Sequence, residues 1–182
     1  MTEPNEADED KAFAAVLLEL FTSKELGRIW WDSRLGRLLE HLPTTDDLSL
    51  ITLKGHLLIE EILGDLLSAK CKDPASLLNL DLSFYKKLGL VRALYGDRLN
   101  EEIVLPPRTW DCVEALNALR NELAHKLESK AVNGKLDRFI SLAFDQVEKP
   151  AEFATKADEL RHAIHSIHAF LASFETAAKR QK

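Results

Sequence analysis

Apolar residues recur along most of this chain at the three- and four-residue intervals of an α-helix, and the alternation typical of β-strands is nearly absent. Leu, Ala and Glu dominate these stretches, and runs of β-branched residues are missing. The pattern predicts helices over residues 11–21, 25–41, 46–70, 83–95, 109–129, 134–147 and 152–179. Because short loops favour antiparallel neighbours, we expect an all-α fold, a helical bundle of about six to seven helices.

Capping and turn residues mark several of the predicted boundaries. Asp46-Asp47 and Ser83 precede helices, where N-capping side chains belong. Gly96 and Gly134 are expected at stops or turns, and Asp73-Pro74 is expected in a loop.

The two longest predicted helices differ in how much of their surface is apolar. In the 152–179 helix, apolar positions at intervals of four and three form one stripe: Phe153, Ala157, Leu160, Ile164, Ile167, Leu171 and Phe174. The 46–70 helix is apolar around most of its circumference, Leu53 and Leu57 included, and only Lys54, Glu61, Asp65 and Ser68 form a narrow polar strip. We therefore predict that 46–70 is a central helix, buried on several sides.

Most of the negative charge lies at the N-terminus. The chain of 182 residues has 24 Lys and Arg against 30 Asp and Glu, and the first ten residues hold Glu3, Glu6, Asp8, Glu9 and Asp10. The rest therefore carries 24 − 25 = −1. We expect residues 1–10 to form a disordered acidic tail and 11–182 a single domain. A near-neutral body argues against gripping long nucleic acid, but it permits a small site that contacts a few nucleotides.

Several classes of protein are disfavoured by what the sequence lacks. No apolar run approaches the roughly 20 residues of a membrane span, and the N-terminus has no signal-peptide pattern. Cys71 and Cys112 match no metal-ligand spacing and are too few for a disulfide framework. Gly-rich phosphate loops and nucleophile motifs are absent. We expect a cytoplasmic protein with no membrane contact, no metal and no cofactor.

The predicted 109–129 helix carries the residues with the most chemical interest. Its apolar stripe is Cys112, Leu116, Leu119, Leu123 and Leu127. On the opposite side, Asn117, Asn121 and His125 form a row at intervals of four. Arg120 stands between the stripe and the row, about 140° around the helix from His125. A second copy of the helix on a two-fold axis would let both residues from both chains face one cleft.

Arginine and histidine together suffice for metal-free cleavage of RNA. A histidine transfers a proton at the 2′-hydroxyl or at the leaving oxygen. An arginine stabilises the charge that develops on the phosphoryl group. The alternative interpretation is a solvated polar helix face in which Arg120 pairs with a nearby acid.

The segment Arg120-Asn121-x-x-Ala124-His125, at the end of a long helix, resembles the signature of the HEPN superfamily. The stretch from Lys54 to Leu63 is similar to the central helix of such domains. The resemblance covers roughly residues 46–130. It implies a helical bundle that forms a homodimer with a composite site, which in active members is a metal-independent endoribonuclease, often a toxin or a phage-defence effector.

Carried over residue by residue, the resemblance implies that Arg120 and His125 are catalytic and that Asn121 shapes the site. RNA would be the substrate, and an antitoxin or regulatory protein would be a partner. One position departs from many toxin members, which have a Tyr two residues after the His, where this chain has Leu127. Other HEPN-like proteins, including those similar to mannitol-operon repressors, are not known nucleases. A non-catalytic helical adaptor or transcriptional regulator is therefore the alternative function.

Other polar residues are weaker candidates. Asn117 shares the row of Asn121, and Glu60, one turn from His56, has the position to orient Arg120 or to pair with a neighbour. On the last helix, Asp158, His162 and His165 have a spacing compatible with metal ligation, although a solvated helix face explains them more simply.

Overall fold

The structure is a computed structural model that describes residues 34–101, 103–125, 130–145 and 153–180. The chain divides into two compact units, Met1–Glu40 and His41–Lys182. This boundary falls inside the 11–182 region that the sequence predicts as one domain. Helix α3 (Arg34–His41) begins in the first unit. The predicted tail 1–10, the predicted 11–21 helix and the first part of the 25–41 helix lie outside the described residues.

The second unit contains six helices among its described residues. They are α4 (Leu48–Lys70), α5 (Pro74–Leu78), α6 (Phe84–Tyr95), α7 (Thr109–His125), α8 (Lys130–Phe144) and α9 (Lys156–Arg180). The described residues contain no β-strand, only an isolated bridge between Arg98 and Val104. The predicted all-α class is thus confirmed. In the described part of the chain, no helix has the length and apolarity needed to cross a bilayer.

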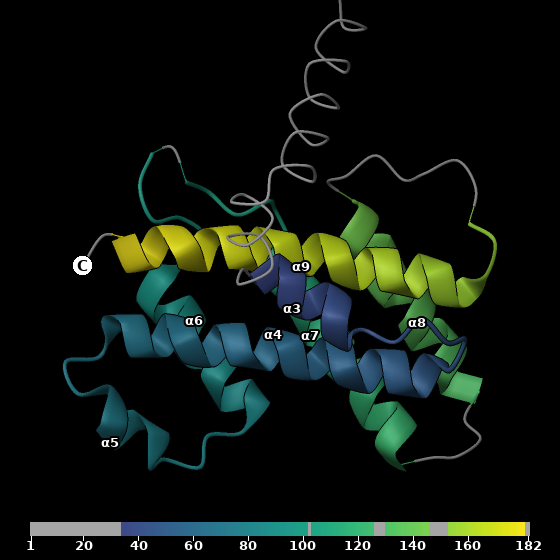
Figure 1. Ribbon diagram of the computed structural model, residues 1–182, viewed down its shortest axis with the longest axis horizontal. Coiled ribbons are helices and arrows are strands. Elements are labelled where there is room, and N and C mark those ends of the chain that lie inside the picture. The colour runs from purple at the N-terminus through teal and green to yellow at the C-terminus, as the bar shows by residue number, and fades with distance from the viewer. Residues whose placement is uncertain (1–33, 102, 126–129, 146–152, 181–182) are drawn as a thin grey trace, which may run out of the picture. The chain divides into compact units, whose positions relative to one another are not determined.

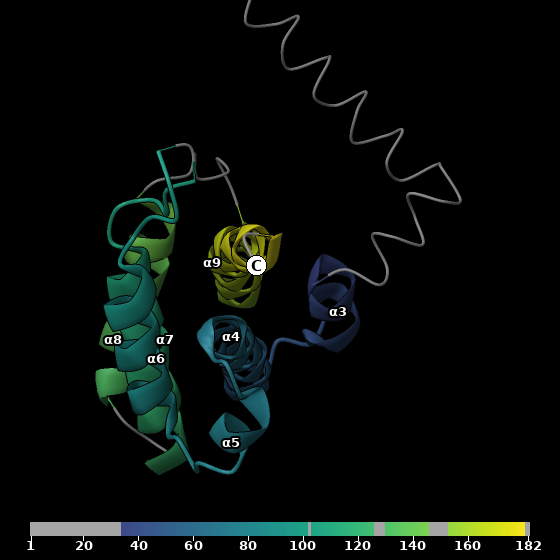
Figure 2. The ribbon, with the colours of Figure 1, turned by 90° about the vertical axis from the view of Figure 1, so that its left-hand side faces the viewer.

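Helix α4 is the centre of this unit, as predicted. It contacts α5, α6, α7 and α9, and Figure 1 shows it running alongside α9. In the view of Figure 2, α6, α7 and α8 lie together in one layer, with α4 and α9 facing that layer. The large apolar side chains of α4 are fully buried from Ile59 to Leu66, and α4 contacts α9, whose predicted stripe is buried from Ala157 to Phe174. Phe153, the first residue of that predicted stripe, precedes α9 and is only half-buried. The burial of apolar surface between these helices stabilises the unit.

The rotation of α4 differs from the predicted one at two leucines. Leu53 is 40 % exposed and Leu57 is 49 % exposed, so the prediction that both are buried was wrong. Thr52 and His56 are buried in their place. The apolar pattern alone could not predict which side of α4 is buried, because it carries no information about the polar partner that α7 provides for His56. Leu50, Leu53 and Leu57 form an exposed row, which we name the α4 leucine stripe.

Two helix ends have the capping chemistry that the sequence predicts. The carboxylate of Asp47 accepts hydrogen bonds from the backbone N–H groups of Ser49 and Leu50, at 2.9 and 3.0 Å. Gly96 ends α6 with a φ of 60°, a left-handed value that glycine adopts without strain. Its carbonyl oxygen accepts a 2.9 Å bond from Nε1 of Trp110, which fastens the first turn of α7 to the end of α6.

Two boundary predictions were wrong. Asp73-Pro74 begins the short helix α5 rather than lying in a loop, since Asp73 caps the N–H groups of Ala75 and Ser76 and Pro74 fits the first turn. Five residues are too few to produce a periodic apolar pattern. Gly134 lies inside α8, which begins at Lys130, so it marks no stop. Nothing lies within 4 Å of the position of a Cβ atom there. A surface glycine costs a helix only about 1 kcal/mol, which the packing of α8 outweighs.

Gly55 sets the close approach of α4 to α9. A Cβ atom at residue 55 would lie 2.7 Å from Cδ1 and 2.9 Å from Cγ2 of Ile164. Both distances are shorter than any normal contact, so the branched side chain of Ile164 occupies the space above the glycine.

We expect Gly55→Ala to lower the free energy of unfolding by about 1 kcal/mol, because overpacking costs about 1–3 kcal/mol and the better helix propensity of Ala returns about 1. Urea unfolding followed by circular dichroism measures the change. Gly64→Ala is the matched control on the same helix, since nothing lies within 4 Å of its Cβ position, and it should be neutral or stabilising. A Gly55→Ala protein as stable as the Gly64→Ala protein would contradict this packing.

Candidate functional site

The candidate site lies along α7, whose apolar side fixes it in the bundle. Cys112, Leu116 and Leu119 are buried, as the predicted stripe requires. Leu123 is only half-buried, and Leu127 lies outside the described residues. Burial raises the pKa of the Cys112 thiol to about 12, so this cysteine does not supply a thiolate nucleophile near neutral pH.

Arg120 is a half-buried cation with no acidic partner among the described residues. Its Nη1 donates a 3.1 Å hydrogen bond to Oδ1 of the adjacent Asn121. Its Nε is buried and has no hydrogen-bond partner in the described structure. Buried polar groups in proteins are nearly always satisfied, and an exception calls for an explanation. The alternative in which Arg120 pairs with a nearby acid therefore does not hold within the described residues.

Arg120 lines a pocket of about 290 Å³ between α7 and the first half of α4, which we name the Arg120 pocket. Its walls are Leu123 and Ala124 from α7, and Ser49, Thr52 and Leu53 from α4. The Thr52 hydroxyl donates to the carbonyl oxygen of Leu48 at 2.7 Å, so its lone pairs remain available while its proton is engaged. The pocket thus combines an uncompensated positive charge with hydroxyl and apolar surface.

Asn117 is half-buried, and its amide oxygen is directed inward rather than to solvent. Its Oδ1 lies 3.1 Å from Nε2 of the buried His56 on α4. Since an amide oxygen only accepts, Nε2 of His56 carries the proton. The His56 ring also stacks on Phe84 of α6, with centroids 4.1 Å apart. The predicted row did not include this inward hydrogen bond, which exists because a buried histidine on the central helix needs a partner.

The surroundings of His56 hold it in its neutral form. Burial lowers the pKa of His56, and the charges of Arg120 and Lys87 act in the same direction. The hydrogen bond with Asn117 and the charge of Glu60 oppose this shift without cancelling it. His56 is consequently an uncharged donor that fixes the orientation of the Asn117 amide.

Glu60 pairs with a neighbour rather than with Arg120. Its Oε1 accepts a 2.7 Å hydrogen bond from Nζ of Lys87 on α6. Of the two roles that the sequence left open for Glu60, the structure shows this one, a link between α4 and α6. A polar row at intervals of four crosses the otherwise apolar helix α4: Thr52, His56 and Glu60. This row is the feature of the sequence that could have predicted an interface of α4 with α6 and α7.

His125 is the last residue of α7, and the structure describes only its backbone position. It follows Arg120 by five positions, so the two residues start from different sides of one helix. Their meeting in one cleft between two subunits therefore stays a prediction.

The remaining candidates have ordinary structural roles. Asp158 accepts hydrogen bonds from Arg161 and from Thr155 at the start of α9, which accounts for it without a metal. Burial, together with the charge of His162, lowers the pKa of His165. In the part of the chain that the structure describes, no group of three or more His, Cys, Asp or Glu side chains could hold a metal ion.

Comparisons of the chain with protein-family models, with curated proteins and with solved structures found no match.

His56→Gln is expected to weaken the pH dependence of stability. Because burial puts the native pKa of His56 below its ordinary value of 6.5, the unfolded chain binds this proton more readily than the native one. The stabilisation is complete above pH 6.5 and is lost as the pH falls from there through the native pKa. Gln keeps an N–H donor for Asn117 and does not titrate. Urea unfolding at a series of pH values tests this.

Asn133→Gln, on the exposed side of α8, is the control for this experiment, since it removes no titrating group and should leave the parent's pH slope intact. His165 contributes to the slope in all three proteins and so cancels from the comparison. An unchanged slope in His56→Gln would mean that His56 is not held neutral in the native protein.

Proposed function

We propose that this protein is a metal-independent endoribonuclease of the HEPN type. It acts as a homodimer, in which Arg120 and His125 of both subunits converge on one scissile phosphate of RNA. The observation that carries the proposal is the state of Arg120: a half-buried guanidinium with a buried, unpartnered Nε and no carboxylate near enough to pair with it in the described structure.

The half-buried Arg120 guanidinium lowers the stability of the protein unless an anion pairs with it. Removing a guanidinium from water without a partner costs free energy, and a ligand that brings a negative charge would offset this cost. The Arg120 pocket has room for a phosphoryl group, and its α4 wall presents the Ser49 and Thr52 hydroxyls beside apolar surface. A phosphate diester would supply one negative charge to pair with Arg120 and several oxygens that accept hydrogen bonds at the pocket wall.

The proposed chemistry assigns a role to each residue. His125 removes the proton of the 2′-hydroxyl or returns one to the 5′-oxygen that leaves. Arg120 donates hydrogen bonds to the non-bridging oxygens and stabilises the charge that builds on them. Asn121 holds one N–H of the guanidinium at 3.1 Å and so limits its rotation, which leaves the other donors for the substrate.

Asn117 and Glu60 support this arrangement from a distance. The bond between His56 and Asn117 fixes the rotation of α7 against α4, and the pair of Glu60 with Lys87 fixes α6 against α4. Both restrain the helix that presents Arg120. In a cytoplasmic toxin or phage-defence effector, an antitoxin or regulatory protein would hold such a site inactive, and the resemblance to the HEPN superfamily is the support for that role.

We expect Arg120→Ala and His125→Ala each to reduce cleavage of RNA about 10²- to 10⁴-fold, the loss typical for a general acid–base or an electrostatic residue. The measurement is cleavage of total RNA by purified protein, with and without EDTA, beside growth on induced expression. Arg120→Lys should recover little, since a point charge does not replace the guanidinium geometry.

Arg180→Ala and His162→Ala are the matched controls, because both side chains are exposed on α9 and lie outside the site. They should cleave RNA like the parent. Intact RNA in every reaction, together with equal growth of all strains, would refute the nuclease proposal.

A non-catalytic adaptor or transcriptional regulator is the second candidate, and the α4 leucine stripe favours it. Exposed leucines at intervals of three and four on one helix form an apolar face that suits a protein partner. If this is the function, Leu53→Ser with Leu57→Ser should abolish retention of a protein partner in pull-downs, whereas Arg120→Ala should not. If Arg120→Ala abolishes retention of the partner and the two leucine substitutions do not, the adaptor role is contradicted.

A further inference from the structure

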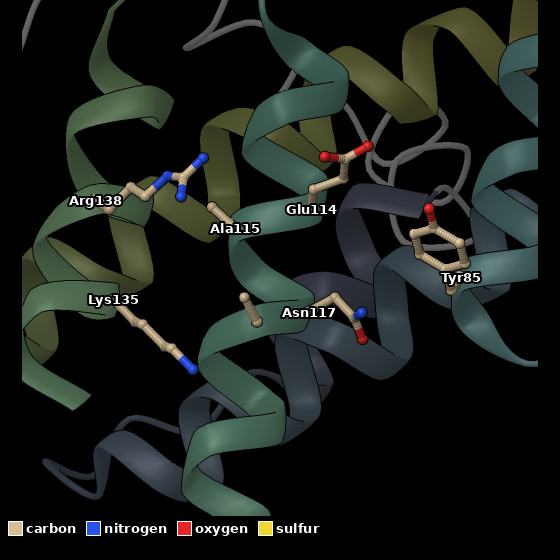
Figure 3. Close-up of a pocket in the computed structure, with 7 residues that line it drawn as sticks. Tyr85, Glu114, Ala115, Asn117, Lys135 and Arg138 are labelled. Carbon is tan, nitrogen blue, oxygen red and sulfur yellow. The ribbon is translucent and has the colours of Figure 1, made fainter. Parts of the chain in front are cut away.

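A second pocket lies on the other side of α7, away from the Arg120 pocket. It has a volume of about 300 Å³ and crosses the outer surface of α7 between α6 and α8. Its floor is formed by the small residues Ala115 and Ala118, and Figure 3 shows Lys135 and Arg138 extending toward α7 from α8, with Tyr85 on the opposite side. We name it the Arg138 pocket. Its size is at the lower end of the range for small-ligand sites.

Among the charged residues that line this pocket, Arg138 is the one without an ion pair in the described part of the chain. Glu114, on the rim, already forms an ion pair with Arg92 of α6. Lys135 forms a 2.6 Å ion pair with Glu122 of α7. Arg138 is exposed and has no ion pair among the described residues. A guanidinium free to form two parallel hydrogen bonds at the wall of a pocket is suited to a phosphate group.

Tyr85 supplies a flat apolar surface at the same pocket. Its side chain is 72 % exposed, although the preceding Phe84 is buried against His56. Figure 3 shows its ring beside the pocket rather than packed under a helix. An exposed ring facing a guanidinium across a groove with a floor of alanines provides a stacking surface for a nucleobase.

Asn117 adds a hydrogen-bonding group whose orientation is fixed. Its Oδ1 is occupied by Nε2 of His56, so its NH₂ group is the part left for the pocket that Asn117 lines. Two amide donors beside a stacking surface match the acceptor edge of a base. An anion alone would make no use of the Tyr85 ring.

We propose that the Arg138 pocket binds one nucleotide of single-stranded RNA, with the base against Tyr85 and Asn117 and a phosphate on Arg138. The choice of RNA over a free nucleotide rests on the proposed function. The backbone position of His125 is seven residues from Ala118, which is within about 20° of two full helical turns and about 10 Å along the axis. A strand anchored in the pocket therefore runs along the side of α7 on which His125 begins, whereas Arg120 lines the pocket on the other side of the same helix.

Fluorescence anisotropy of a labelled, unstructured RNA oligonucleotide tests this, with all variants made in the His125→Ala chain so that nothing is cleaved. Tyr85→Ala should weaken binding about 5- to 150-fold, the effect of losing one stacked base, whereas Tyr85→Phe should bind like the His125→Ala parent. Arg138→Ala should weaken binding and reduce the slope of log K against log salt by about 0.7, the value for one phosphate contact to a single strand. Arg180→Ala is the control and should change neither.

Competition by AMP and by inorganic phosphate identifies what the pocket recognises. Weak competition by AMP and none by phosphate supports an RNA strand. AMP that binds as tightly as the oligonucleotide would overturn RNA in favour of a free nucleotide. Phosphate that competes as well as AMP, with no effect of Tyr85→Ala, would overturn the nucleotide site altogether.

The RNA-binding pocket and the nuclease are separate proposals, and each can be refuted without the other. RNA cleavage by the parent, with Tyr85→Ala and Arg138→Ala binding normally, would refute the pocket and leave the proposed nuclease standing. Binding that depends on Tyr85 and Arg138, in a protein that cleaves nothing, would keep the pocket and refute the nuclease.

Discussion

The hydrogen bond between His56 and Asn117 is the constraint on which both pockets depend. Helix α4 is covered on several sides, so a polar group on its inner face must find a partner within the protein. His56 finds Asn117, and this 3.1 Å contact fixes the rotation of α7 about its own axis. Arg120 is then placed on the side of α4, and Ala118 on the side open to the groove between α6 and α8.

The same contact has a cost that the rest of the bundle offsets. Nδ1 of His56 and Nε of Arg120 are both buried without partners in the described structure, and each such atom lowers stability by about 1–3 kcal/mol. The long apolar interface between α4 and α9 compensates for them. These two polar atoms thus lie where α4 and α7 meet, and Nδ1 of His168 on α9 is a third buried atom without a hydrogen-bond partner in the described structure.

Much of the fold could be predicted from the sequence because it depends on periodicity and on local capping. The stripe of α9, the buried residues of α7 and the cap at Asp47 belong to this class. What the sequence could not show depends on partners distant in the chain. Leu53 and Leu57 look like core residues until α7 is seen to present Asn117 to the neighbouring face of α4.

In the candidate site, too, the local features could be predicted from the sequence, and those that depend on distant partners could not. The motif residues Arg120 and Asn121 were identified by pattern, and the structure shows them in contact. The roles of His56 and Glu60 required knowledge of what lies across the interface, since a carboxylate one turn from a histidine has several partners within reach. Tyr85 and Arg138 come from different helices, and no spacing in the sequence relates them.

The contact of Gly55 with Ile164 has a consequence for motion. The branched side chain of Ile164 lies directly over Gly55, where no Cβ atom intervenes, and it opposes sliding of α9 along α4, since a shift would press Ile164 against a larger neighbouring residue. These two helices must then move together, as one rigid frame. Any adjustment that admits a ligand therefore falls to the layer of α6, α7 and α8.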